Sequence, residues 1–146
     1  MARINYHAIV MVKETRIGRR PNHSPGRRIL VVDDIADVAD TLAMLLTATG
    51  HQTQVAYDGP NAITAARNFR PEVVLLDIGL PGMSGLGVAQ QLRREFKGGQ
   101  LLVVAVTGYD QPEDRWQSKE AGFDYHLVKP VSPQVLEELL GHLAIA

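Results

Sequence analysis

The sequence predicts an α/β fold in which helices cover both faces of a parallel sheet. Short β-branched runs are apolar without alternation, as expected for strands that are buried on both faces. Segments of helical periodicity stand between these runs. The alternation repeats five times from residue 28 to residue 146, which indicates five strand–helix units.

The first unit begins with the apolar run Ile-Leu-Val-Val at 29–32. Apolar residues then recur at helical spacing up to Gly50, and glycine commonly ends a helix. The second unit has a more polar strand at 52–56, which suggests a place nearer an edge of the sheet. Its helix is expected to start at the Gly-Pro pair of 59–60 and to end near Phe69.

The third unit has a fully apolar strand, 73–76, that ends at Asp77. A loop rich in Gly and Pro leads to Ser84, the expected N-cap of a helix that ends near Phe96. The fourth and fifth strands are expected at 101–106, ending at Thr107, and at 125–128, ending at Lys129. The last two helices are expected to start at Asp110, which forms a capping box with Glu113, and at Ser132-Pro133.

Charge and composition divide the chain into two parts. Residues 1–28 carry a net charge of +6 and the remainder carries −7, so we expect 1–27 to be a basic, poorly ordered tail or linker and 28–146 to be one folded domain. No apolar run approaches the roughly 20 residues that span a bilayer, so no membrane segment is expected. The chain has no cysteine, and a cytoplasmic location is the expectation.

Polar residues collect where the predicted strands end. The carboxyl ends of parallel strands lie on one edge of a sheet, which brings together Asp33, Asp34, Asp77, Thr107 and Lys129. Three neighbouring carboxylates repel unless a hard cation neutralises them, and Mg²⁺ prefers such oxygen ligands. One carboxylate is then free to attack phosphorus, while the lysine and the threonine stabilise phosphate oxygens. The sequence therefore predicts a magnesium-dependent phosphoryl site.

The motifs around these residues match a known family. The chain resembles the receiver domain of response regulators in four segments, VVDD at 31–34, LLDIGLPGMSG at 75–85, VTG at 106–108 and VKP at 128–130. The resemblance implies a flavodoxin-like, doubly wound (βα)5 sheet of five parallel strands in the order 2-1-3-4-5. It also implies a signalling module of a two-component phosphorelay, whose only chemistry is its own phosphorylation and dephosphorylation.

The resemblance assigns a role to each residue of the site. Asp77 is the implied phosphoacceptor for a phosphoryl group from phosphohistidine, and Thr107 and Lys129 bind that group. Asp34, Asp33 (through water), Asp77 and the backbone carbonyl of Gly79 are the implied Mg²⁺ ligands. The Lys129–Pro130 bond corresponds to the cis peptide of the family.

The resemblance also implies a switch and a set of partners. Thr107 is expected to move with His126, or with Tyr125 in its place, although an exposed edge histidine is the alternative for His126. The wording of the motifs is most similar to the C-terminal receivers of hybrid sensor kinases. The expected partner is a histidine kinase or a histidine phosphotransfer protein, with an unknown output partner and no DNA-binding domain in the chain.

Three other functions were considered. A phosphatase with an aspartyl nucleophile is disfavoured, because enzymes of the haloacid dehalogenase type carry a second Asp where this chain has Gly79. A P-loop nucleotidase is disfavoured because no Gly-rich loop ending in Gly-Lys-Ser/Thr occurs. A scaffold receiver that is never phosphorylated remains an alternative, although all five residues of the phosphoryl site are present.

Overall fold

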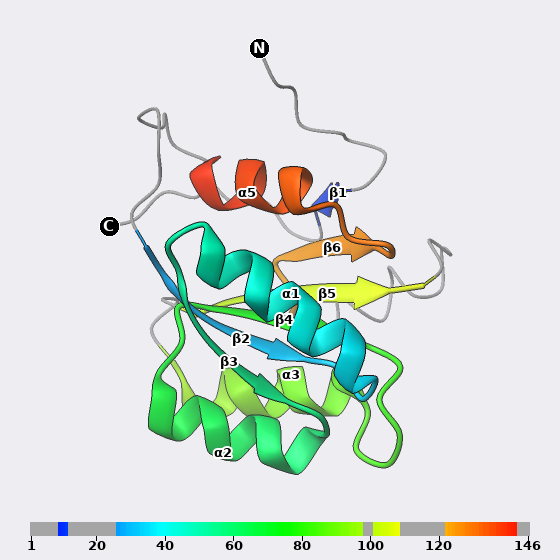
Figure 1. The fold of residues 1–146 in the computed structure, drawn as a ribbon. Helices are drawn as coiled ribbons and strands as arrows, with labels where there is room; N and C mark the ends of the chain where they lie inside the picture. The colour runs from blue at the N-terminus through cyan, green and yellow to red at the C-terminus, as the bar shows by residue number, and fades with distance from the viewer. Residues whose placement is uncertain (1–8, 12–25, 98–100, 109–121, 143–146) are drawn as a thin grey trace.

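The computed structural model describes residues 9–11, 26–97, 101–108 and 122–142. Its sheet has the strand order β1-β6-β5-β4-β2-β3 (Figure 1). The strands are β1 (Ile9–Met11), β2 (Arg28–Val32), β3 (Gln52–Ala56), β4 (Val73–Asp77), β5 (Leu102–Thr107) and β6 (Tyr125–Val128). The strands from β2 to β6 all pair in parallel. This confirms the predicted order 2-1-3-4-5, since β2 is the first predicted strand.

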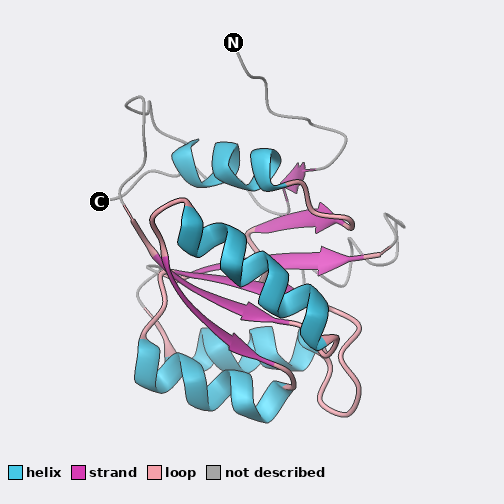
Figure 2. Cartoon of the chain, viewed as in Figure 1, coloured by secondary structure: helices cyan, strands magenta, loops and turns pink. Residues whose placement is uncertain are grey.

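Helices cover both faces of the sheet, as Figure 2 shows. The described helices are α1 (Ala36–Ala48), α2 (Gly59–Phe69), α3 (Gly85–Glu95) and α5 (Pro133–His142). α1 and α5 pack on one face, whereas α2 and α3 pack on the other. The predicted fourth helix, with Trp116, falls in 109–121 and lies outside the described residues. No helix in the described part of the chain is long and apolar enough to cross a membrane.

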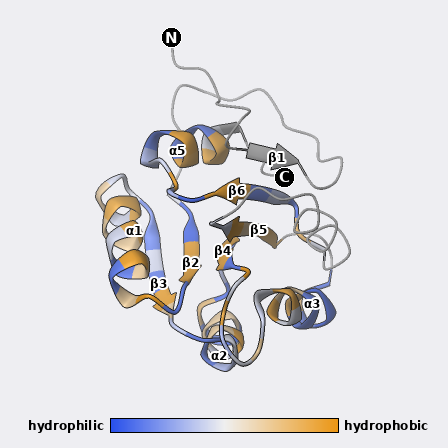
Figure 3. Cartoon of the chain, turned by 90° about the vertical axis from the view of Figure 1, so that its right-hand side faces the viewer, coloured by the Kyte–Doolittle hydropathy of each residue, from blue (hydrophilic) through white to orange (hydrophobic). Residues whose placement is uncertain are grey.

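The core forms two layers because side chains of a strand alternate between its faces. In β2, Ile29 and Val31 face α1 and α5, whereas Leu30 and Val32 face α2 and α3. All four side chains are almost fully buried. Both layers are apolar, which explains why the strands read as uninterrupted apolar runs. Figure 3 shows the same sheet between hydrophobic helix faces.

The helix ends follow local chemistry, with one difference from prediction. Ser84 caps α3, since its Oγ accepts a hydrogen bond from the Gly87 N–H at 3.2 Å. α2 begins at Gly59, within the predicted Gly-Pro pair, but its cap is Asp58 and not Gly59, and Asp58 Oδ1 accepts from the Asn61 N–H at 2.8 Å. A carboxylate satisfies a free N–H at the first turn, which Gly59 cannot do because it has no side chain.

The packing face of α1 also differs from the face indicated by the periodicity. The residues that recur at helical spacing in the sequence are Val38, Leu42, Leu45, Leu46 and Thr49. Of these, Val38 and Leu45 are 39% and 41% exposed. The helix instead turns Ala39 and Ala43 toward the sheet, together with Leu46. Small side chains allow a helix to lie close to the strands, so the apolar positions that follow the best period are not the ones that are buried.

One short strand lies inside the segment that was expected to be a tail. Residues 9–11 form β1, which pairs antiparallel with β6 at the edge of the sheet. At the other end of the segment, Arg27 is buried, and its N–H donates to His51 Nδ1 at 3.1 Å. The tail expectation for residues 12–25 falls outside the described residues.

Candidate functional site

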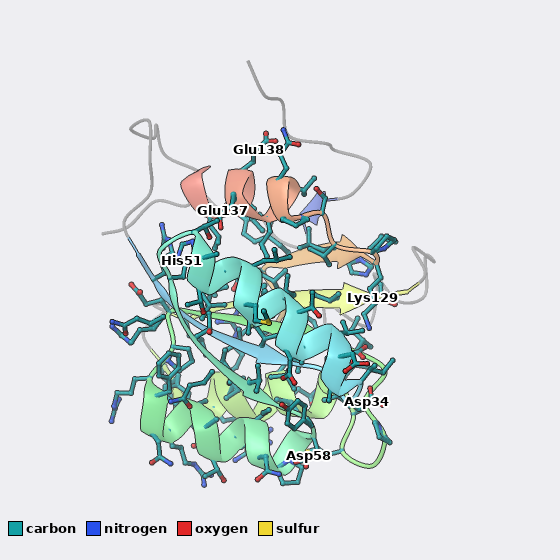
Figure 4. The ribbon with its side chains drawn as sticks, in the orientation of Figure 1. Asp34, His51, Asp58, Lys129, Glu137 and Glu138 are labelled. Atoms are coloured by element: carbon teal, nitrogen blue, oxygen red, sulfur yellow. The ribbon has the colours of Figure 1, made fainter. Side chains whose placement is uncertain are left out.

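The predicted site residues meet at the carboxyl ends of the parallel strands. Asp77 and Thr107 are the last residues of β4 and β5, while Asp33 and Lys129 directly follow β2 and β6. Figure 4 shows Asp34 and Lys129 at this same end of the molecule. One carboxylate oxygen from each of the three aspartates lies within 4.8 Å of the others. The structure therefore brings together the three aspartates and Lys129, and it places Thr107 at the end of the neighbouring strand.

Lys129 joins two of the three carboxylates. Its Nζ donates to Asp33 Oδ2 at 2.9 Å and to Asp77 Oδ2 at 3.3 Å. The backbone is held nearby, because the Lys129 N–H donates to the Thr107 carbonyl at 2.7 Å. The Lys129–Pro130 peptide is cis, as the resemblance implied. One ammonium group thus partly balances two neighbouring negative charges.

The loop that follows Asp77 folds back onto the end of β4. The Gly79 N–H donates to Asp77 Oδ1 at 2.9 Å, and the Gly85 N–H donates to the Ile78 carbonyl at 3.1 Å. A Cβ added at Gly85 would lie 2.3 Å from the backbone oxygen of Asp77. Position 85 therefore requires glycine for steric reasons. The sequence contained this signal as a glycine in the motif, but its cause is visible only in the close approach of α3 to β4.

The electrostatics of the site follow from partial burial. Burial raises the pKa of Asp77, and the charge of Asp33 raises it further, against the Gly79 N–H and Lys129, which lower it. Burial works against the charged form of Lys129, but the hydrogen bond to Asp33 and the charges of Asp77 and Asp33 raise its pKa overall. Asp77 therefore carries its negative charge at a cost, which a nearby cation would relieve.

The three carboxylates fit a divalent cation with oxygen ligands. Asp34 is exposed, so it offers its oxygens to an ion approaching from solvent, while Asp33 and Asp77 line the buried side. Asp33 Oδ1 is held by the Ile35 N–H at 2.9 Å, which orients its carboxylate. Mg²⁺ is commonly bound by one or two carboxylates with waters and phosphate oxygens completing the shell. This acidic cluster is consistent with the Mg²⁺ sites of receiver domains.

The predicted switch residues are all buried. Thr107 is 8% exposed, and Tyr125 and His126 are fully buried. The alternative of an exposed edge histidine at His126 is therefore wrong. The movement of these side chains stays a prediction.

An apolar cavity of about 580 Å³ lies beside the site and was not anticipated from the sequence. It runs between α1 and the segment that follows β6, and both Asp33 and Lys129 contribute to its wall. The partly exposed Val38 and Leu45 line it as well. The sequence of α1 could not indicate this cavity. Helical periodicity identifies the apolar face of a helix, but it does not show which residues of that face are covered by other segments.

The match to a known family is specific. The family model for the response regulator receiver domain matches residues 29–141. The chain belongs to this family. It is a receiver domain, the phosphoacceptor module of two-component signalling, and the acidic cluster of Asp33, Asp34 and Asp77 is consistent with that function.

Receiver domains of known structure have the same fold. A CheY-like receiver domain protein from Methanospirillum hungatei is 30% identical with a TM-score of 0.72, over 80% of this chain and 91% of that protein. The chemotaxis protein CheY4 of Vibrio cholerae is 25% identical with a TM-score of 0.76, over 83% of this chain and all of CheY4. The sheet and helices of this receiver are thus those of its family.

Longer relatives correct the expectation about partners. The DNA-binding response regulator MtrA of Mycolicibacterium paratuberculosis is 40% identical over 75% of this chain and 48% of MtrA. The probable transcriptional regulatory protein TcrX of Mycobacterium tuberculosis is 45% identical over 71% of this chain and 44% of TcrX. The chain spans about half the length of these relatives.

The names of these relatives contradict the expected partners. We expected a kinase or a phosphotransfer protein as the partner and no DNA-binding domain in the chain. MtrA is named as a DNA-binding response regulator and TcrX as a probable transcriptional regulator. The motifs could not predict the output partner, because their residues form the phosphoryl site, which is shared by receivers with very different outputs. The finer likeness to hybrid-kinase receivers stays a prediction.

Proposed function

We propose that Asp77 is the residue that accepts the phosphoryl group in this receiver, with Mg²⁺ bound by the adjacent carboxylates. The observation that supports this most directly is the position of Asp77 at the end of the central strand β4, with Oδ2 3.3 Å from Lys129 Nζ. Asp33 lies one residue beyond the end of β2, and its Oδ2 is closer to Lys129 Nζ, at 2.9 Å, so Asp33 is held more firmly by the lysine than Asp77 is. Asp34 is exposed and suits a metal ligand.

The proposed reaction is an in-line displacement at phosphorus. An oxygen of the Asp77 carboxylate forms the new O–P bond as the bond between phosphorus and the donor's leaving atom breaks, and the donor keeps that electron pair. Lys129, freed from Asp77, pairs with a phosphoryl oxygen, and the Thr107 hydroxyl donates to another. Asp34, Asp77, the Gly79 carbonyl and, through water, Asp33 would hold Mg²⁺, which would offset the negative charge of the donor. Hydrolysis of the acyl phosphate returns the carboxylate.

The output is also part of the proposal. We expect phosphorylation to move Thr107 and to change the position of His126 or Tyr125, which lie on the neighbouring strand β6. The likeness to MtrA and TcrX supports regulated DNA binding as the output of the protein that contains this receiver. A cytoplasmic location belongs to the same proposal.

Mass spectrometry after incubation with acetyl phosphate and Mg²⁺ tests the proposal. The protein should gain one phosphoryl group, and Asp77→Asn should gain none. Asp34→Ala, or a chelator in place of Mg²⁺, should suppress the gain strongly. Asp40→Asn is the matched control, because it makes the same carboxylate-to-amide change as Asp77→Asn at an exposed position on α1, and it should be phosphorylated like the parent protein. A phosphorylated Asp77→Asn protein would refute the assignment.

A further inference from the structure

The outer edge of β6 is occupied by the chain's own N-terminal residues. β6 is the last of the parallel strands, and β1 pairs with it antiparallel in the register Ile9–Leu127, Val10–His126 and Met11–Tyr125. Figure 1 shows β1 alongside β6. The edge strand of the sheet next to β6 is therefore β1, which comes from the N-terminal segment and precedes the five strand–helix units.

An open strand edge is a binding surface for another strand. Its unpaired N–H and C=O groups accept any extended segment, and proteins commonly cover such edges. Residues 8–12 read Ala-Ile-Val-Met-Val, an apolar and β-branched run within an otherwise basic segment, which suits this position. Only 16 residues connect Met11 to the start of β2, so the strand is a tethered ligand at high effective concentration.

β6 also connects this edge to the phosphoryl site. Lys129 follows β6 directly, and its Nζ contacts both Asp77 and Asp33. On its inner side β6 pairs with β5, which ends at Thr107. A shift of β6 would therefore reach the lysine and the threonine of the site on one side and β1 on the other.

We propose that residues 9–11 are an intramolecular ligand for the edge of β6 and that occupation of the phosphoryl site strengthens their docking. The coupling part of this inference rests on the proposed function. Its direction follows from His126, which is fully buried in the structure that has β1 docked. In the switch hypothesis, Thr107 moves toward the phosphoryl group and the side chain from β6 fills the space that it leaves, so a buried ring rather than a protruding one belongs to the phosphorylated state. Linkage is reciprocal, so docking of β1 should in turn favour phosphorylation.

Hydrogen exchange of backbone amides in the full chain tests the inference. The test variant is Val10→Pro combined with Met11→Pro. Successive residues of a strand point their N–H groups to opposite edges, so the pair removes an amide that faces β6 whichever residue carries it. Glu14→Pro combined with Thr15→Pro is the matched control, because it places the same two prolines beyond the strand.

The inference predicts three results. Without ligand, amides of residues 125–128 should exchange about tenfold faster in the test variant than in the parent or the control. Beryllofluoride with Mg²⁺, a mimic of the phosphoryl group, should slow exchange in both 9–11 and 125–128 of the parent. The test variant should also bind beryllofluoride with Mg²⁺ more weakly than the control, because the two binding equilibria are linked.

Each contrary result has a distinct meaning. Equal exchange of 125–128 in the parent and the test variant would show that β1 does not dock, and the inference would be overturned. Docking without any effect of beryllofluoride on 9–11, while the loop at 78–84 responds, would overturn the coupling and leave the proposed function intact. If beryllofluoride changed neither the loop nor β1, the proposed function would fail together with the coupling.

Discussion

Replacing Asp77 by Asn should make the metal-free protein more stable at neutral pH, although it removes the proposed phosphoacceptor. With an effective dielectric constant of about 20, Lys129 Nζ at 3.3 Å attracts the carboxylate by about 5 kcal/mol. Asp33, within 4.8 Å, repels it by about 3.5 kcal/mol or more. The remaining attraction, at most about 1.5 kcal/mol, is smaller than the several kcal/mol that burial of a carboxylate costs.

We therefore expect Asp77→Asn to raise the free energy of unfolding by about 1 to 2 kcal/mol in the presence of a chelator. With Mg²⁺ present, the parent protein should become more stable than the variant. Mg²⁺ binds the folded parent protein and, at a concentration one hundred times its dissociation constant, raises its free energy of unfolding by about 2.7 kcal/mol. The variant has one carboxylate fewer and should gain much less. Urea unfolding with chelator and at rising Mg²⁺ concentrations measures both effects.

The pH dependence has a definite sign. The pKa of Asp77 is raised in the folded state by burial, so the folded protein favours the protonated carboxyl. The free-energy cost of burying the charged Asp77 carboxylate is absent at pH values below the pKa that Asp77 has in the unfolded chain. This cost is complete at pH values above the pKa that Asp77 has in the folded protein. The advantage of Asp77→Asn should thus shrink as the pH falls toward about 4.

Glu72→Gln is the control for this prediction, since it makes the same chemical change near the opposite ends of the strands, where Glu72 accepts from the Arg28 N–H. It should show neither the reversal by Mg²⁺ nor the gain in stability. If Asp77→Asn were less stable than the parent in chelator at neutral pH, the electrostatic reasoning would be refuted.

Three further substitutions test the supporting structure by urea unfolding. Gly85→Ala should lower the free energy of unfolding by about 2 kcal/mol or more, because its Cβ would meet the Asp77 backbone, whereas Gly87→Ala, with no such contact, should be neutral or slightly stabilising; equal effects would contradict the steric argument. Ser84→Ala should cost about 1 kcal/mol through loss of the α3 cap, and no loss would mean that water replaces the hydroxyl. Asp124→Ala should cost about 3 kcal/mol, because the buried carboxylate pairs with Arg93, and a loss below 1 kcal/mol would contradict that role.

The sequence alone predicted the order of the described strands and the aspartates and lysine that meet at their carboxyl ends. Apolar runs without alternation located the strands at 29–32, 73–76 and 101–106, because a strand buried on both faces must be apolar at every position. The residues at the strand ends could be grouped without coordinates, since parallel strands place their carboxyl ends on one edge. Asp77, Thr107 and Lys129 are far apart in the chain, yet this rule brought them together.

The tertiary structure decided what depends on contacts between distant segments. The buried face of α1 is set by how closely Ala39 and Ala43 approach the sheet, which periodicity does not measure. The requirement for glycine at position 85 arises from the backbone of Asp77 across the loop. The pairing of residues 9–11 with β6 joins segments more than 100 residues apart, and a three-residue strand carries too little pattern to specify its partner. Such features follow from packing geometry, which local propensity does not contain.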